Sequence, residues 1–397
     1  MSEAVFPARD RCAIVGVGQT EFTRDSGVSV LSLATSACLA ALADAGLEPD
    51  DVDGIVRCQM DKVDPNSLAA AAGFSNITYW GEVSNGGMAP PAQVGQAMAA
   101  VLAGLATTVI CFRSLNGRSE DRFGSGERRS ATPEVGGRGS YDEYFLPFGL
   151  MTPGQVFALL AQRHMSKFGT TSEQLGAVSV ICREHANQTP HAQLHGQTLT
   201  LEQHQASRMI STPLRLYDFC LETDGACALI VTSAERAKDM KRPPVLIRSV
   251  AQAIPANNRA GMMYSSLLRD DITDLAWTEV AKLLWTRAGL GPSDIDVAQL
   301  YDCFTISVIL QLESFGFCKP GEGGLLAASG ALARGGDMPM NTGGGHLSEG
   351  YIHGMNHVVQ AVRQLRGDAD MQIEGAETSL VTGGPLPISS ALVLRRG

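Results

Sequence analysis

The chain has 397 residues, a length that favours two large folded units over a single core. Its net charge of −10 argues against nucleic acid or an anionic membrane surface as the main partner. Nine cysteines without CxxC or Cys/His ligand spacing predict no metal site, and an odd number of them without a secretion signal predicts reduced thiols in the cytoplasm.

Apolar strands and amphipathic helices alternate from the start of the chain. Cys12–Val17 is an apolar run of strand length, and apolar residues recur at helical spacing over Leu31–Ala45. A glycine and a proline then end the helix and lead into a strand at Gly54–Arg57. This alternation indicates helices layered on a sheet.

The segment Gly86–Phe112 contains no charged residue, which raises the question of a membrane span. Two prolines and four glycines interrupt it, and Gly104 breaks the apolar run at helical length. We therefore predict a buried helix at Ala92–Ala103, a buried strand at Thr107–Phe112 and no membrane insertion.

An insertion of about 113–223 follows within the first half. Its opening part, Arg113–Gly139, holds six arginines and six glycines, which is typical of a loop. The arginines are equally consistent with phosphate binding and with a solvated loop balanced by its own acids. Helices are expected at Gly154–Phe168 and Thr171–Gln188, packing over the mouth of the active site.

The two halves of the chain repeat each other. Ala45–Asp53 recurs as Ala288–Asp296, 243 residues later, and each copy runs from a helix end through a proline turn into a strand. A second correspondence, between the strands that end each half, makes duplication a better account than coincidence. The charged, proline-rich connection Glu235–Pro244 places the boundary, so we predict halves at 1–242 and 243–397.

Two motifs near the C-terminus carry the strongest functional signal. One is Leu300-Tyr-Asp-Cys-Phe304, and the other is the glycine-rich stretch Asn341–Asn356. Together they resemble the thiolase superfamily of the sterol-carrier-protein type, whose members have His-Asp-Cys-Phe and Gly-His-Pro at these places. The resemblance covers nearly the whole chain. It implies the α/β thiolase fold, with duplicated βαβαβαββ halves in a five-layer α/β/α/β/α sandwich.

The cysteines that thiolases use for acyl transfer are missing. The position of the family's nucleophile falls on Gly87, and the position of its second cysteine falls within Leu380–Pro385, which has no sulfur. An acyl-enzyme is therefore excluded unless another thiol takes over. Cys303 is the nearest candidate, but in the resembled fold it faces away from the nucleophile position, and we expect it to be structural.

Two tyrosines stand where the family has catalytic histidines. Tyr301 and Tyr351 each supply a phenol with an ordinary pKa of about 10. A retro-aldol cleavage needs one group to remove the proton of a β-hydroxyl and another to stabilise the enolate or return a proton to it. We therefore predict that both tyrosines are catalytic, with His353 assisting them.

We expect four residues to bind the substrate. One offers an amide side chain, one is the glycine at the nucleophile position, and two are glycines whose backbone amides can approach a carbonyl oxygen. These residues are Asn356, Gly87, Gly344 and Gly384. No metal or other cofactor is expected, because the substrate itself would be a CoA thioester.

The combination most resembles the aldolases of steroid side-chain degradation. It implies retro-aldol cleavage of a β-hydroxyacyl-CoA, giving a ketone and a short acyl-CoA such as propionyl-CoA. The resemblance also implies a homodimer formed through the N-terminal halves, and a small partner with an OB-fold and a zinc ribbon. Two alternatives stay open: a thiolase or acyltransferase with a displaced cysteine, and a non-catalytic scaffold that binds CoA esters.

Overall fold

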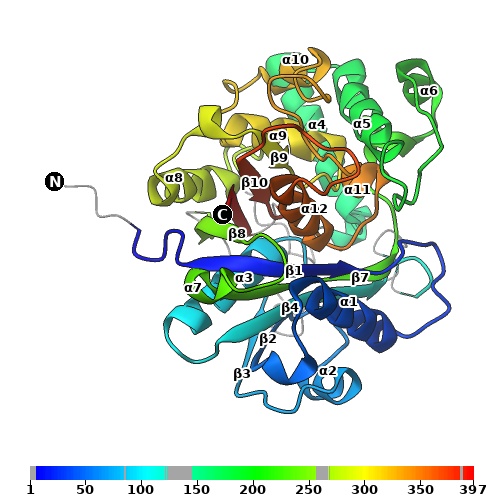
Figure 1. The fold of residues 1–397 in the computed structure, drawn as a ribbon. Helices are drawn as coiled ribbons and strands as arrows, with labels where there is room; N and C mark the ends of the chain where they lie inside the picture. The colour runs from blue at the N-terminus through cyan, green and yellow to red at the C-terminus, as the bar shows by residue number, and fades with distance from the viewer. Residues whose placement is uncertain are drawn as a thin grey trace.

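The computed structural model describes residues 6–84, 86–120, 122, 145–255, 267, 269–384 and 388–397. Most of the arginine-rich segment predicted as a loop at 113–139 lies outside these residues. Within the described chain, strands and helices alternate as the sequence predicts, and the layered α/β arrangement is confirmed (Figure 1).

Five strands of the N-terminal half lie in the order β3-β2-β4-β7-β1. Their bounds are Cys12–Gln19 for β1, Gly54–Cys58 for β2, Tyr79–Val83 for β3, Thr108–Asn116 for β4 and Asp224–Ser233 for β7. The pairs β2–β3 and β2–β4 are parallel, whereas β7 is antiparallel to both β4 and β1. The predicted buried strand at Thr107–Phe112 is therefore β4, which is longer than expected and buried throughout.

Four strands of the C-terminal half continue the sheet in the mirrored order β8-β11-β10-β9. They are Val245–Ala253 (β8), Val297–Gln299 (β9), Thr378–Thr382 (β10) and Ser389–Arg396 (β11). The first strands of the two halves pair through Ala13 with Leu246 and Ile14 with Val245, which joins all nine strands into one mixed sheet. Apart from the edge strand β3, the described sheet is thus symmetric in strand order about the β1–β8 seam.

Helices cover the strands in layers. The helices α1 (Val30–Ala45) and α2 (Pro65–Ala72) lie on the outside of the N-terminal half, and α8 (Trp277–Ala288) and α9 (Thr305–Ser314) lie on the C-terminal half (Figure 1). Between them, α3 (Ala89–Leu102) and α12 (Met355–Arg366) contact strands of both halves. The uncharged sequence around α3 is explained by this central position, because strands of both halves surround the helix.

Most of the remaining helices form a cap on the C-terminal half, whereas α7 (Ala234–Ala237) packs on β1 and β7 of the N-terminal half (Figure 1). In the insertion, α4 (Pro153–Phe168) and α5 (Ser172–Ala186) pack on α9, and α6 (Leu201–Ala206) packs on α5 (Figure 1). The two-stranded sheet of β5 (Met209–Ser211) and β6 (Leu214–Arg215) follows. Shorter helices of the cap are α10 (Gly323–Ala328) and α11 (Gly345–Ser348).

Local signals in the sequence set the helix ends. The hydroxyl of Ser29 accepts a hydrogen bond from the backbone amide of Ser32 and caps α1, which ends at Gly46 with φ +75°. A threonine–glutamine capping box, Thr171 with Gln174, begins α5 in the same way. In the described part of the chain, no helix is both long enough and apolar enough to cross a membrane.

Candidate active site

A cavity of about 820 Å³ opens between the start of α3, the insertion helices α4 and α5, and the loops that follow β9 and precede α12. Its wall contains both predicted tyrosines and His353, together with the consecutive glycines Gly86 and Gly87. Residues separated by more than 200 positions in the sequence therefore meet here. The prediction that the insertion covers the mouth of the site agrees with the lining, which includes residues of α4 and α5.

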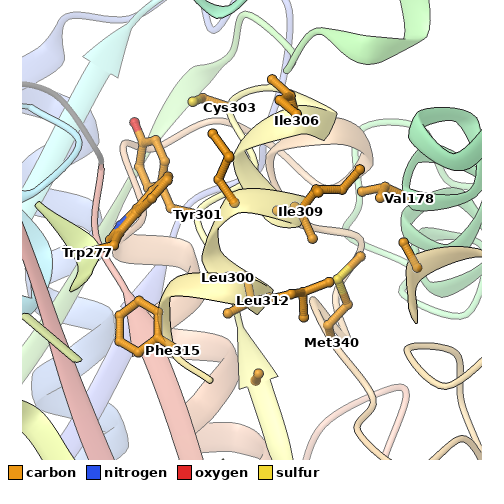
Figure 2. Close-up of a cluster of buried hydrophobic side chains, with 14 of the residues drawn as sticks. Val178, Trp277, Leu300, Tyr301, Cys303, Ile306, Ile309, Leu312, Phe315 and Met340 are labelled. Carbon is orange, nitrogen blue, oxygen red and sulfur yellow. The ribbon is translucent and has the colours of Figure 1, made fainter. Parts of the chain in front are cut away.

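Tyr301 is held rigidly at the end of β9. Its backbone amide donates to Thr382 Oγ1 at 2.9 Å and to Gln311 Oε1 at 3.1 Å, and its ring is 3% exposed. Figure 2 shows the ring beside Trp277, with the hydroxyl pointing away from Phe315 and Leu312. The apolar core thus orients the ring and leaves the phenol oxygen at the cavity.

Tyr351 approaches the same point from the loop before α12. The two phenol oxygens, Oη of Tyr301 and Oη of Tyr351, lie 2.8 Å apart and share a hydrogen bond. The backbone amide of Tyr351 donates to Thr223 Oγ1 at 2.9 Å, and its ring packs edge-on against His346 with centroids 4.8 Å apart. The two hydroxyls therefore form one coupled pair within the cavity.

Both phenols are neutral in this environment. Burial raises the pKa of Tyr301 well above its ordinary value of 10, and the neighbouring Tyr351 raises it further. Burial also raises the pKa of Tyr351, although the hydrogen bond from Tyr301 and the charge of Arg113 partly oppose this effect. The pair can consequently pass protons without either oxygen carrying a resting charge.

The two consecutive glycines make room for the site's side chains. A Cβ atom on Gly87 would lie 2.7 Å from Tyr301 Cζ and closer still to its hydroxyl. A Cβ atom on Gly86 would lie 2.5 Å from Cε1 of His353. Neither glycine has a positive φ, so space around the site, and not backbone conformation, requires glycine here.

His353 lies beside Tyr351, with ring centroids 4.9 Å apart and an edge-on geometry. Its backbone has φ +50°, an uncommon conformation for a residue other than glycine, and such strain often marks functional positions. Its Nδ1 atom lies 3.1 Å from Nε and 2.5 Å from Nη2 of the buried Arg113. Sequence reasoning singled out His353 but missed Arg113 as a site residue, because Arg113 was grouped with a surface loop.

Only two of the four predicted substrate-binding residues lie in the cavity wall. Gly87 and Gly384 line the cavity, whereas Gly344 and Asn356 are not among the residues that form its wall. The Gly384 amide, expected to face a substrate oxygen, donates to the Gly87 carbonyl at 2.7 Å. The Asn356 amide nitrogen donates to Glu349 Oε2 at 3.0 Å and to the Gly350 carbonyl at 3.1 Å, which ties down the loop that carries Tyr351.

A buried carboxylate network lies behind the tyrosines, and the sequence analysis did not identify it. Asp302 accepts hydrogen bonds from the His346 amide at 2.8 Å, the Leu347 amide at 3.2 Å and His357 Nε2 at 3.1 Å. Ligand atoms of Asp302, His346 and His357 all lie within 4.8 Å of one another, so these residues have the spacing to hold a metal ion. Three donors already bind the carboxylate, and we assign the network to holding the Tyr351 loop.

Arginines line part of the cavity wall, and the solvent-exposed ones form its rim. Of the five, Arg24, Arg122 and Arg208 are exposed, Arg118 is half-buried and Arg183 is buried. Arg122 Nε lies 2.7 Å from Glu222 Oε2, and Arg118 Nε lies 3.9 Å from the same carboxylate oxygen. Arginine is suited to binding phosphate through paired hydrogen bonds, so this rim suits an anionic ligand.

The inner walls are apolar. Phe157 stacks on Phe304 with ring centroids 4.4 Å apart, and Phe219 meets Phe304 edge-on at 5.1 Å. All three rings line the cavity. The site thus combines a basic mouth, aromatic walls and a polar end formed by the tyrosines.

Comparisons with known proteins identify the family. The C-terminal residues 261–396 match the model for "Thiolase C-terminal domain-like". The chain is 43% identical to the 17-hydroxy-3-oxo-4-pregnene-20-carboxyl-CoA lyase of Mycobacterium tuberculosis, over 97% of this chain and 99% of that protein. It is also 43% identical to the steroid side-chain-cleaving aldolase of Thermomonospora curvata, over 96% and 97% of the two chains. This chain belongs to the thiolase superfamily, in the branch of the steroid side-chain-cleaving aldolases.

The fold agrees with that assignment. The structure of an "Ltp2-ChsH2(DUF35) aldolase" superposes with a TM-score of 0.90 at 42% identity, covering 99% of each chain. The predicted thiolase fold and the predicted class of enzyme, a lyase of this superfamily, are confirmed.

The thiols of the aldolase are poorly suited to covalent catalysis. Cys303 and Cys220 both lie in the cavity wall. Burial, however, raises the pKa of Cys303 well above its ordinary value, and its Sγ contacts Ser307 Oγ at 3.9 Å. Burial raises the pKa of Cys220 in the same way. A neutral thiol is a weak nucleophile, which disfavours the displaced-cysteine alternative.

Proposed function

We propose that this aldolase cleaves the side chain of a steroid CoA thioester by a retro-aldol reaction. The substrate would carry a tertiary hydroxyl on ring D, β to the thioester carbonyl. The products would be a ring-D ketone and a short acyl-CoA such as propionyl-CoA. The observation that carries the proposal is the 2.8 Å hydrogen bond between the Tyr301 and Tyr351 hydroxyls at the end of the cavity.

The tyrosine pair accounts for the proton movements of this reaction. The proton relay is concerted: the phenol nearer the β-hydroxyl accepts its proton while passing its own proton across the hydrogen bond, and the second phenol gives up its own proton toward Cα as it receives this one. The Cα–Cβ bond breaks, the hydroxyl carbon becomes the ketone, and the electron pair remains on Cα as the thioester enolate. The proton released by the second phenol reaches Cα in the same relay, so one proton moves from oxygen to carbon and neither tyrosine carries a charge.

The shape and charge of the cavity support the substrate class. The rings of Phe157, Phe219 and Phe304 offer a flat apolar surface to a ring system, and the volume of about 820 Å³ suits a ligand of this size. The arginine rim would bind the phosphates of CoA at the solvent side. The thioester would then lie between the aromatic walls and the rim, next to the tyrosines.

We also propose a larger assembly. The similar solved structure is that of an aldolase with a DUF35 protein, which supports a small OB-fold and zinc-ribbon partner for this chain. A homodimer through the N-terminal halves, 1–242, and a duplicated C-terminal half, 243–397, complete the proposal. The mirrored strand order about the β1–β8 seam supports the duplication.

The test is cleavage of 17-hydroxy-3-oxo-4-pregnene-20-carboxyl-CoA, the compound in the name of the Mycobacterium relative. The enzyme should be purified with any subunit that co-purifies, and both products followed by mass spectrometry. We expect stoichiometric ketone and short acyl-CoA. Binding without cleavage would favour the scaffold alternative, although a scaffold would have no need of two hydrogen-bonded hydroxyls in its cavity.

A further inference from the structure

An ion pair lies directly behind the active site. Arg113 is on β4 and is fully buried, and its guanidinium bonds to the equally buried carboxylate of Asp61. Asp61 also accepts the backbone amides of Cys58 and Ser114, each at 3.1 Å. The two amides fix the carboxylate of Asp61, and the carboxylate in turn fixes the guanidinium of Arg113.

The guanidinium determines the protonation of His353. Its Nε and Nη2 atoms lie 3.1 Å and 2.5 Å from His353 Nδ1, and a guanidinium has only donors. The Nδ1 atom must therefore supply a lone pair, which places the single proton of a neutral ring on Nε2. Protonation of Nδ1 would direct its proton at a cation and is disfavoured.

Burying such a pair is not an efficient way to stabilise a fold. Desolvation offsets much of the attraction between two buried charges, and well-packed apolar side chains often serve equally well. The pair contacts a ring that lines the cavity and has a strained backbone, which indicates a functional reason for keeping it.

Two backbone amides expected near the thioester oxygen are already bonded within the fold. The amide of Gly383 donates to the Ser390 carbonyl and the amide of Gly384 donates to the Gly87 carbonyl, both at 2.7 Å. With these two amides occupied, a side-chain donor can take their place in stabilising the negative charge that develops on that oxygen.

We propose that Arg113 and Asp61 are positioning residues that hold His353 as a neutral Nε2–H donor to the thioester oxygen of the substrate. The inference rests on the proposed function for its substrate. Arg113 itself does not contact the substrate, and its charge acts only through the imidazole ring of His353.

The tautomer can be measured without any substrate. In enzyme labelled with ¹⁵N-histidine, the His353 signals are assigned by comparison with a His353→Gln variant. We expect a protonated Nε2 and an unprotonated Nδ1 in the wild type. The double variant Arg113→Met/Asp61→Asn, which removes both charges together, should show a mixture of tautomers. An unchanged Nε2–H tautomer in the double variant would overturn the proposal.

A matched control separates positioning from stability. Arg366 and Asp44 form a second pair with a buried arginine, joined at 2.7 Å, and Asp44 accepts a backbone amide from Val17. Arg366 is in the last turn of α12, at the opposite end of the helix from His353, which lies just before its first turn. The variant Arg366→Met/Asp44→Asn should therefore lose stability but keep its kcat.

Kinetics then decide the role. We expect Arg113→Met/Asp61→Asn to lose about 10²-fold in kcat, the loss typical of a misplaced oxyanion donor, with KM changed less than about threefold. A loss in kcat no larger than that of the control pair would overturn the proposal. If the double variant does not fold, Arg113→Lys keeps a cation beside Asp61 and serves in both measurements, with a smaller expected loss. Absence of cleavage by the wild type would instead refute the proposed function.

Discussion

The ring of Tyr301 occupies the space in which a side chain on residue 87 would lie. A Cβ atom there would approach Cζ of the tyrosine to 2.7 Å, a distance that non-bonded carbon atoms do not adopt. The resemblance places the thiolase nucleophile at Gly87, and in this structure a cysteine side chain there and Tyr301 would exclude each other. The absence of a side chain at residue 87 and the position of the Tyr301 phenol are therefore structurally coupled.

Gly87→Ala should therefore impair the aldolase by displacing Tyr301. We expect a loss of kcat of at least about tenfold and a lower melting temperature, because overpacking a filled site commonly costs about 1–3 kcal/mol. The double variant Gly87→Cys/Tyr301→His should relieve the contact and give a thiol that iodoacetamide labels. Wild-type activity in Gly87→Ala would show that Tyr301 can move without consequence.

Replacing either tyrosine by phenylalanine removes one hydroxyl and little volume. Each variant should lose about 10²–10⁴-fold in kcat with little change in substrate affinity, since both groups act in proton transfer. The double variant should lose far less than the product of the two, because the hydroxyls form one relay across 2.8 Å. Stability should fall by about 1 kcal/mol at most. Steady-state rates and dissociation constants on the three variants provide the check, and full activity in either single variant would remove that tyrosine from the mechanism.

Cys303→Ala should keep most of the activity. The retro-aldol forms no covalent intermediate, and burial holds the pKa of this thiol far above neutrality. Iodoacetamide treatment followed by peptide mapping gives an independent measurement. Inactivation that follows labelling of Cys303 would instead support the displaced-thiol mechanism.

Arg208→Gln should weaken binding of CoA esters without slowing the chemistry. The residue lines the outer cavity, so we expect KM to rise roughly tenfold, the loss of about one charge-assisted hydrogen bond. A substrate with the same acyl group on N-acetylcysteamine in place of CoA lacks the phosphates, and the variant should show an unchanged KM for it. Lys167→Gln, an equal change of charge outside the cavity wall, is the control. An equal effect in both variants would indicate only a general loss of positive charge.

Mild acid should destabilise the protein through His185. Burial lowers the pKa of this ring to about 4, its Nδ1 contacts the Met340 carbonyl at 2.9 Å, and its Nε2 accepts the Arg334 amide. Between pH 6.5 and pH 4 the unfolded chain binds a proton that the folded ring does not, so stability falls as pH falls, by about 1.4 kcal/mol per pH unit. Urea unfolding at pH 7 and pH 5 should show this loss, and His185→Gln should reduce it. An equal pH dependence in the variant would exclude His185 as its source.

The sequence by itself determined the elements and the family resemblance. Periodicity and helix-ending residues placed α1, α5, β1 and β2 within a few residues of their observed ends, because those signals act between neighbours in the chain. The motifs around Tyr301 and Tyr351 identified both tyrosines as candidates, and the missing cysteines excluded the usual acyl transfer.

Only the tertiary structure decided how those residues work together. Three hydrogen bonds join positions up to about 300 residues apart in the sequence. They connect the two phenols, the Gly384 amide with the Gly87 carbonyl, and Arg113 with His353. Arg113 was predicted in a loop because the stretch that follows it is rich in glycine and arginine, yet it lies within the buried strand β4. Local sequence specifies backbone conformation, whereas burial and hydrogen-bond partners depend on which distant strands the fold brings together.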